Sequence, residues 1–136
     1  MELKNRLGQE YLYRSVMTAS PAELIVMLFD ACIKDVKLAA MALEEKHDLM
    51  KANTYFVKAQ KIIAELMSSL DMDVEISGQL LPIYEFMLHT LMHANVQKDT
   101  SALPGVIEIL TAQRDTWKQI AQPNRAAQGM PEVMCG

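Results

Sequence analysis

Apolar residues recur every three or four positions through four long segments of the chain, with polar residues between them. This spacing is typical of helices that bury one face. It predicts helices over residues 21–46, 49–70 and 76–96, and a fourth that begins near Ser101. The core stripe of the first helix comprises Ile25, Leu28, Phe29, Cys32, Val36, Ala39 and Leu43. The core stripe of the third comprises Ile76, Leu80, Ile83, Tyr84, Met87, Leu91 and Ala94.

Residues that start helices precede the first two segments. Ser20 is a suitable N-cap, Pro21 suits the first helical position, and Glu23 completes a capping box. Asp48 is a suitable cap for the second helix. Pro82 has no N–H to donate inside the third helix. We therefore expect this helix either to begin about three residues before Pro82 or to kink there.

Helices of roughly 20 residues joined by short connections favour an antiparallel four-helix bundle, so the expected fold class is all-α. We expect one domain over residues 1–122, in which residues 1–19 form an N-terminal cap segment. Residues 123–136 contain two prolines and two glycines without any periodicity, and we expect a disordered tail there.

Composition supports this fold and restricts the partners. The chain is 51% hydrophobic, only 6% aromatic and contains 11 methionines among 136 residues, a balance that favours helices. The net charge of −4 and the lack of a basic run argue against nucleic acid and anionic membranes as partners. The longest uninterrupted apolar run has six residues, whereas crossing a membrane takes about 20. The first residues lack the apolar core of a signal peptide, so we expect a cytoplasmic protein.

Histidine and carboxylate side chains suggest three kinds of site: a di-iron site, a single-metal site and a phospho-accepting histidine. The sequence does not supply all the residues that any of them requires. A di-iron site in a bundle needs a Glu-x-x-His motif on two helices, and the chain has one, Glu44 to His47, at the end of the first helix. Glu85, His89 and His93 share one face of the third helix and could bind a metal ion. That face lies opposite the core stripe, so a solvated surface explains it better. His89 also lacks the small or basic neighbours of a phospho-accepting histidine.

The two cysteines do not indicate nucleophilic catalysis. Cys32 lies in the core stripe and Cys135 in the tail, and neither has a histidine fixed beside it. No glycine-rich phosphate loop is present either. We therefore expect no cofactor, no metal and no enzymatic activity.

A second apolar stripe accompanies the core stripe of the first helix and comprises Leu24, Met27, Ala31, Leu38 and Ala42. The third helix has a shorter second stripe of Leu81, Leu88 and Met92. Both are either wide flanks of core-facing helices or a groove for an amphipathic partner helix, to which flexible methionines are suited. An open groove reduces solubility, so the segment around Tyr11 and Val16 is a candidate to cover it. Val26 falls outside both stripes of the first helix, nearer its polar face.

Several blocks of sequence resemble the FliS-type flagellin-specific export chaperones. The most specific are VMTASPAEL at residues 16–24 and RDTWKQ at residues 114–119. The others are Tyr11, MLFD at 27–30, KAQKIIAEL at 58–66, SLD at 69–71, YEFM at 84–87 and AN at 94–95. The blocks follow the family's order. Phe29 stands where the family usually has Tyr, and Pro82 and the Pro104–Gly105 pair are uncommon inside its helices.

The resemblance implies a cytosolic helical chaperone that binds the disordered C-terminal segment of flagellin, prevents premature polymerisation and delivers flagellin to the flagellar type III export apparatus. It also ties Tyr11 and Val16 to flagellin binding. Helical geometry adds further candidate flagellin contacts: Leu24, Met27, Leu38, Leu81, Leu88 and Met92. We expect the free chain to be a monomer or a weak dimer. The alternatives are a homo-oligomeric scaffold that pairs its second stripes between copies, and a metal-binding bundle.

Overall fold

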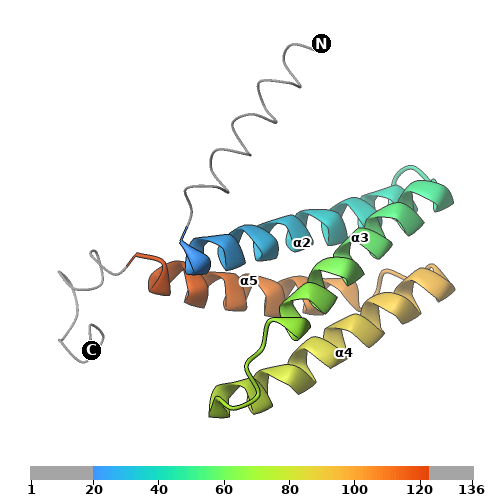
Figure 1. The fold of residues 1–136 in the computed structure, drawn as a ribbon. Coiled ribbons are helices and arrows are strands. Elements are labelled where there is room, and N and C mark those ends of the chain that lie inside the picture. Colours follow the sequence, from blue (N-terminus) through green and yellow to red (C-terminus); the bar gives the residue numbers. More distant parts are fainter. Residues whose placement is uncertain (1–19, 123–136) are drawn as a thin grey trace.

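The structure, a computed structural model, describes residues 20–122, and that range contains four α-helices and no strand. The helices are α2 (Pro21–Glu44), α3 (Leu49–Ser68), α4 (Glu75–Gln97) and α5 (Leu103–Ile120) (Figure 1). Each predicted helix is confirmed, with ends within two residues of those expected. The expected N-terminal cap segment and disordered tail lie outside the described residues.

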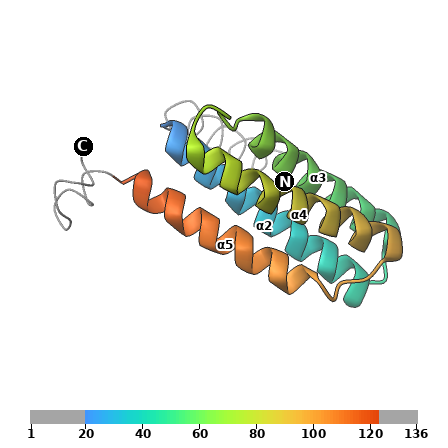
Figure 2. The ribbon, with the colours of Figure 1, turned by 90° about the horizontal axis from the view of Figure 1, so that it is seen from below.

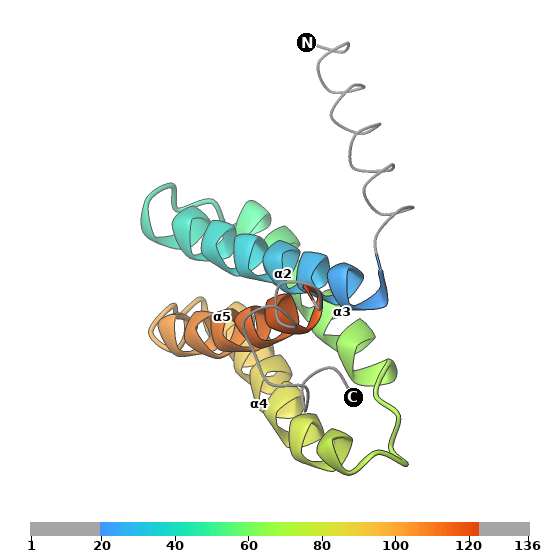
Figure 3. The ribbon, with the colours of Figure 1, turned by 90° about the vertical axis from the view of Figure 1, so that its left-hand side faces the viewer.

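The four helices form an antiparallel bundle. α2 packs against α3 and α5, and α3 packs against α4, whereas α4 touches α5 much less. Short connections join consecutive helices, so neighbours run in opposite directions (Figures 1 and 2). The start of α4 diverges from the end of α5, as the two side views show (Figures 1 and 3). The all-α four-helix-bundle prediction is therefore confirmed, with one end of the bundle more open than the other.

The expected N-caps Ser20 and Asp48 are confirmed, but the predicted capping box forms only in part, because the Glu23 carboxylate accepts from the Ser20 hydroxyl and not from the Ser20 backbone N–H. The Ser20 hydroxyl oxygen accepts a hydrogen bond from the Glu23 N–H at 3.2 Å, and the hydroxyl donates to the Glu23 carboxylate. The Asp48 carboxylate accepts from the Lys51 N–H at 3.0 Å. The bonds from the Glu23 and Lys51 N–H groups satisfy backbone donors that have no partner within their own helices. These local interactions explain why α2 and α3 begin where the sequence predicts.

Pro82 lies inside α4, which runs without interruption from Glu75 to Gln97. The alternative in which this helix begins only three residues before Pro82 is therefore wrong. Val74 caps α4 without a side-chain hydrogen bond, and its carbonyl accepts from the Ser77 N–H at 3.0 Å. Burial of Tyr84 and Met87 just beyond the proline holds the helix against the bundle. Tertiary packing thus offsets the hydrogen bond that proline removes.

The core lies along the inner faces of all four helices, and most of the predicted core residues are buried there. Two assignments were wrong. Val26 is buried rather than near a polar face, and Ile33, seven residues later, is buried on the same flank. This happens because α2 has a neighbour on each side, so its buried face is wider than one stripe. Ile76 was expected to point inward but is 52% exposed, since it lies in the first turn of α4 at the open end.

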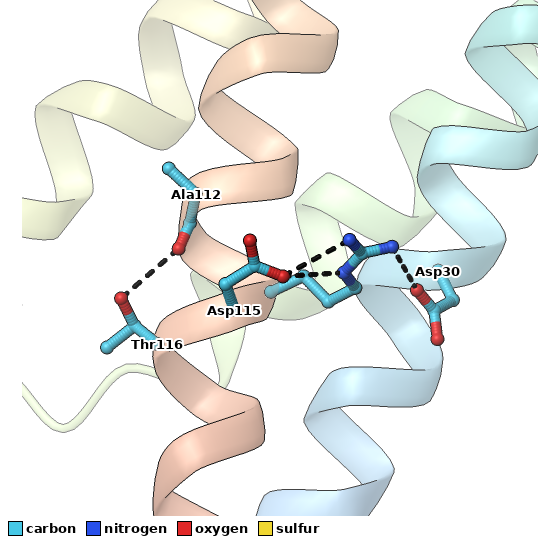
Figure 4. Close-up of polar contacts among 5 residues, drawn as sticks. Asp30, Ala112, Asp115 and Thr116 are labelled. Atoms are coloured by element: carbon cyan, nitrogen blue, oxygen red, sulfur yellow. Dashed lines mark hydrogen bonds and ion pairs between the residues drawn. The ribbon is translucent and has the colours of Figure 1, made fainter.

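Polar contacts join the helices near the bundle surface. The Asn95 side-chain amide of α4 donates to the Asn53 side-chain oxygen of α3 at 2.9 Å. The Arg114 guanidinium of α5 lies 3.1 Å from carboxylate oxygens of both Asp30 in α2 and the adjacent Asp115 (Figure 4). These contacts join α3 to α4 and α2 to α5. They contribute little to stability, because exposed ion pairs are worth at most about 1 kcal/mol.

Candidate functional site

The polar groups that suggested metal chemistry do not form an enclosed site. Glu85, His89 and His93 are exposed on the outer face of α4, as expected. Glu44 and His47 are exposed at the end of α2 and in the turn after it. Across residues 20–122, no three His, Cys, Asp or Glu side chains lie close enough together to hold a metal ion. These side chains are therefore a solvated surface.

Cys32 is fully buried in α2, and its thiol is directed at the backbone carbonyl of Ala59 in α3, with the sulfur 3.7 Å from that oxygen. Burial, and to a smaller extent the nearby charge of Asp35, raises the pKa of the Cys32 thiol to about 12. A thiol with this pKa is protonated and unreactive at physiological pH. Cys32 is thus a core residue and not a nucleophile.

The second stripe of α2 lies along the edge between α2 and α3. Leu24, Met27 and Leu38 are partly buried there, and Leu38 lines a small hollow together with Tyr55 of α3. Ala42, which the sequence assigned to this stripe, is buried in the core. The stripe is therefore partly a helix-packing flank and partly accessible surface.

The second stripe of α4 lies along the opposite edge of α3. Leu81 and Leu88 are partly buried, and Met92 is 47% exposed. Asn95 lies seven residues after Leu88, on the same flank, and its bond to Asn53 shows that this flank faces α3. The structure thus places the two stripes on different edges of α3 and does not bring them together into one groove. The remaining predicted contacts, Tyr11 and Val16, lie outside the described residues.

An apolar cavity at the open end of the bundle was not anticipated from the sequence. Its volume is about 220 Å³. It opens between the end of α3, the start of α4, the start of α2 and the end of α5. Its apolar lining consists of Ile25, Leu66, Leu70, Val74, Ile76, Leu80, Tyr84 and Trp117. Four of these residues, Ile25, Ile76, Leu80 and Tyr84, belong to the core stripes predicted for the first and third helices. Periodicity alone could not show that they leave a space between them.

The cavity continues into exposed apolar surface. Met72 and Val74 of the α3–α4 connection and Ile76 of α4 are all exposed, as is Ile120, one turn beyond Trp117. Tyr84 is buried at the base of the cavity, and burial raises the pKa of its phenol, which therefore stays neutral. Exposed apolar side chains near an apolar cavity make this end of the bundle a candidate interaction site.

Arg114, which forms two ion pairs, precedes the cavity-lining Trp117 by three residues in α5. Hydrogen bonds to Asp30 and then to Asp115 raise the pKa of the guanidinium, which remains charged at any relevant pH. Trp117, one helical turn after Arg114, lines the cavity. The Arg–Asp–x–Trp block thus supplies an ion pair to α2 and a side chain to the cavity lining.

The protein is a four-helix bundle with apolar residues along both edges of α3 and an apolar cavity at one end. Bundles of this class are suited to binding another polypeptide. The chain matches the family described as flagellar protein FliS over residues 3–124. It is 40% identical over 115 residues to the flagellar secretion chaperone FliS of Bacillus subtilis strain 168, covering 85% of this chain and 86% of that protein. It is 34% identical over 110 residues to the flagellar secretion chaperone FliS of Salmonella typhimurium strain LT2, covering 79% and 81%.

The chain therefore belongs to the FliS family. The family is one of flagellar secretion chaperones and not of enzymes, in agreement with the resemblance found from the sequence blocks. No helix within residues 20–122 is long and apolar enough to cross a membrane.

Proposed function

We propose that this chain is a cytoplasmic export chaperone that binds the disordered C-terminal segment of flagellin. Binding keeps the segment from polymerising prematurely, and the complex delivers flagellin to the flagellar type III export apparatus. Membership in the FliS family is the observation that carries this proposal. The apolar edges along α3 and the end cavity support it, since a segment that folds on binding needs apolar surface to lie against.

A binding assay with the C-terminal segment of the cognate flagellin tests the proposal. We expect one-to-one binding by calorimetry and a gain in peptide helicity by circular dichroism. Met27→Glu and Leu88→Glu should each weaken binding, because both place a charge on a partly buried apolar edge. Met50→Glu is the matched control, since Met50 is 83% exposed and lies on neither edge.

Three outcomes would contradict the proposed function, the predicted contact residues or the expected monomer, respectively. If the wild-type chain does not bind the peptide, the proposed function is wrong. If Met27→Glu or Leu88→Glu unfolds the bundle, those residues serve the core and the predicted contacts there are wrong. If light scattering shows a stable oligomer that the peptide leaves unchanged, the homo-oligomeric scaffold is favoured over the expected monomer or weak dimer.

A further inference from the structure

The open end of the bundle combines an apolar cavity with an acidic rim. Asp71, Asp73 and Glu75 stand at alternate positions of the chain, the last two on either side of the cavity-lining Val74, and all three are exposed. Asp71 itself lines the cavity, and its carboxylate accepts from the Asp73 N–H at 3.0 Å. Within residues 20–122, none of these carboxylates forms an ion pair. From residue 66 to residue 80, which includes the whole α3–α4 connection, there is no Lys, Arg or His.

We infer that this end of the bundle is an anchor site for a basic amphipathic helix of the partner. One bulky apolar side chain of that helix enters the cavity between Leu80 and Trp117, and Lys or Arg residues three or four positions away lie beside Asp71 and Asp73. The inference rests on the proposed function, because it assigns this helix to the flagellin segment. It adds where the anchoring apolar side chain binds and which charge the neighbouring residues of the partner helix carry.

The size of the cavity fits a single side chain. A cavity of roughly 150 Å³ can hold a benzene ring, and drug-sized ligands need about 300 Å³ or more. At about 220 Å³, this cavity has room for one Phe, Leu or Met side chain. The cavity is lined by the start of α4 and the end of α5, which diverge from each other there (Figure 3).

The charge of the rim determines which helices fit. Three carboxylates beside an apolar opening attract cations and repel acidic segments. The chain carries a net charge of −4, and this rim concentrates negative charge where a partner would insert its anchor. The positive partial charge at the start of α4 is offset by Glu75 in its first turn.

Trp117 is the only tryptophan of the chain, so its fluorescence reports directly on the cavity. We expect the flagellin C-terminal peptide, made without tryptophan, to shift Trp117 emission to shorter wavelength as its anchor excludes water. Ile76→Gln, at the exposed mouth, should weaken the peptide about tenfold. Val96→Gln is the matched control, because Val96 is a 76% exposed apolar residue at the other end of α4. It should change the affinity less than about twofold.

A second variant fills the interior of the cavity and leaves Ile76 at its opening unchanged. Ser77 is buried and lines the cavity, so Ser77→Leu fills part of the space that the anchor needs. Circular dichroism of the free variant checks that it folds, and its affinity should also fall about tenfold. If this variant misfolds, Ile76→Gln still decides the question.

The rim is tested by removing its charge. The combined variant Asp71→Asn, Asp73→Asn and Glu75→Gln should bind the peptide about threefold more weakly at low salt. The difference should vanish near 1 M salt, where charges are screened beyond about 3 Å. A second combined variant, Glu45→Gln, Glu85→Gln and Glu108→Gln, makes the same change in net charge at exposed positions elsewhere and should leave affinity unchanged.

The outcomes distinguish this inference from the proposed function. If the wild-type chain fails to bind the peptide, both are overturned. If it binds but Trp117 emission and both cavity variants are unaffected, only the anchor site is overturned. Tighter binding by the cavity variants would show that another part of this chain occupies the cavity. A shift in Trp117 emission on raising the protein concentration without peptide would show that a second copy does. Either result overturns the inference.

Discussion

Replacing Phe29 with alanine should lower the free energy of unfolding by about 3–5 kcal/mol, the usual range for a buried phenylalanine. Phe29 has no exposed surface, and its ring lies 6.5 Å from that of Tyr84, so the pair links α2 to α4 across the core. A phenylalanine buries about 200 Å², which at about 25 cal/mol per Å² corresponds to about 5 kcal/mol before the part that alanine retains is subtracted. The two estimates agree.

Urea unfolding followed by circular dichroism measures this cost. With a slope of about 2 kcal/mol per M, the midpoint should fall by about 1.5–2.5 M. The slope itself should not change if the variant still unfolds in one step. Because a domain of this size is stable by only about 5–15 kcal/mol, the variant should remain folded but close to its limit.

Phe86→Ala is the matched control for Phe29→Ala. Phe86 lies on α4 and is 57% exposed, so the same chemical change should cost less than about 1 kcal/mol. Equal costs for the two variants would refute the placement of Phe29 at the centre of the core. A cost below about 1 kcal/mol for Phe29→Ala would refute it as well.

Three further predictions concern single features of the bundle. Gly78→Ala should stabilise the protein by about 0.5–1 kcal/mol in urea unfolding, because Gly78 lies in α4 and an added Cβ meets no atom within 4 Å; a loss of stability would contradict this placement. Arg114→Gln should cost less than about 1 kcal/mol, and a double-mutant cycle with Asp30→Asn should give a coupling energy in the same range, because both side chains are partly exposed. In a Cys135→Ser background, Cys32 should not react with a thiol reagent at pH 8 until the protein is unfolded, because its pKa of about 12 keeps the thiol protonated and burial blocks access. Rapid labelling of the folded protein would show that Cys32 is accessible.

Most of the local structure could be predicted because its causes lie close together in the sequence. The Ser20 and Asp48 caps act on N–H groups three residues away, and the sequence shows both partners. The inward face of each helix follows from spacings of three and four residues, which explains why Phe29 and Leu91 were assigned correctly. A family resemblance spread over most of the chain supplied the chaperone class, which periodicity could not have done.

The width of the buried face and the cavity depended on the tertiary structure. Val26 is buried because α5 packs on a second side of α2, and no pattern within α2 shows how many neighbours a helix has. The second stripes of α2 and α4 lie on different edges of α3, an arrangement set by the order in which the helices pack.

The sequence by itself thus determined where α2 and α3 begin and which face of each helix is mainly apolar, because these depend on residues within one or two turns of each other. Only the tertiary structure decided that α4 and α5 diverge, so that Leu80 and Trp117 border an open cavity and do not close a core. The distance between two helices is set by all the side chains packed between them, and those come from distant parts of the chain. The acidic residues Asp71, Asp73 and Glu75 can be found in the sequence, but only the tertiary structure shows that they lie at the end of the bundle where this cavity opens.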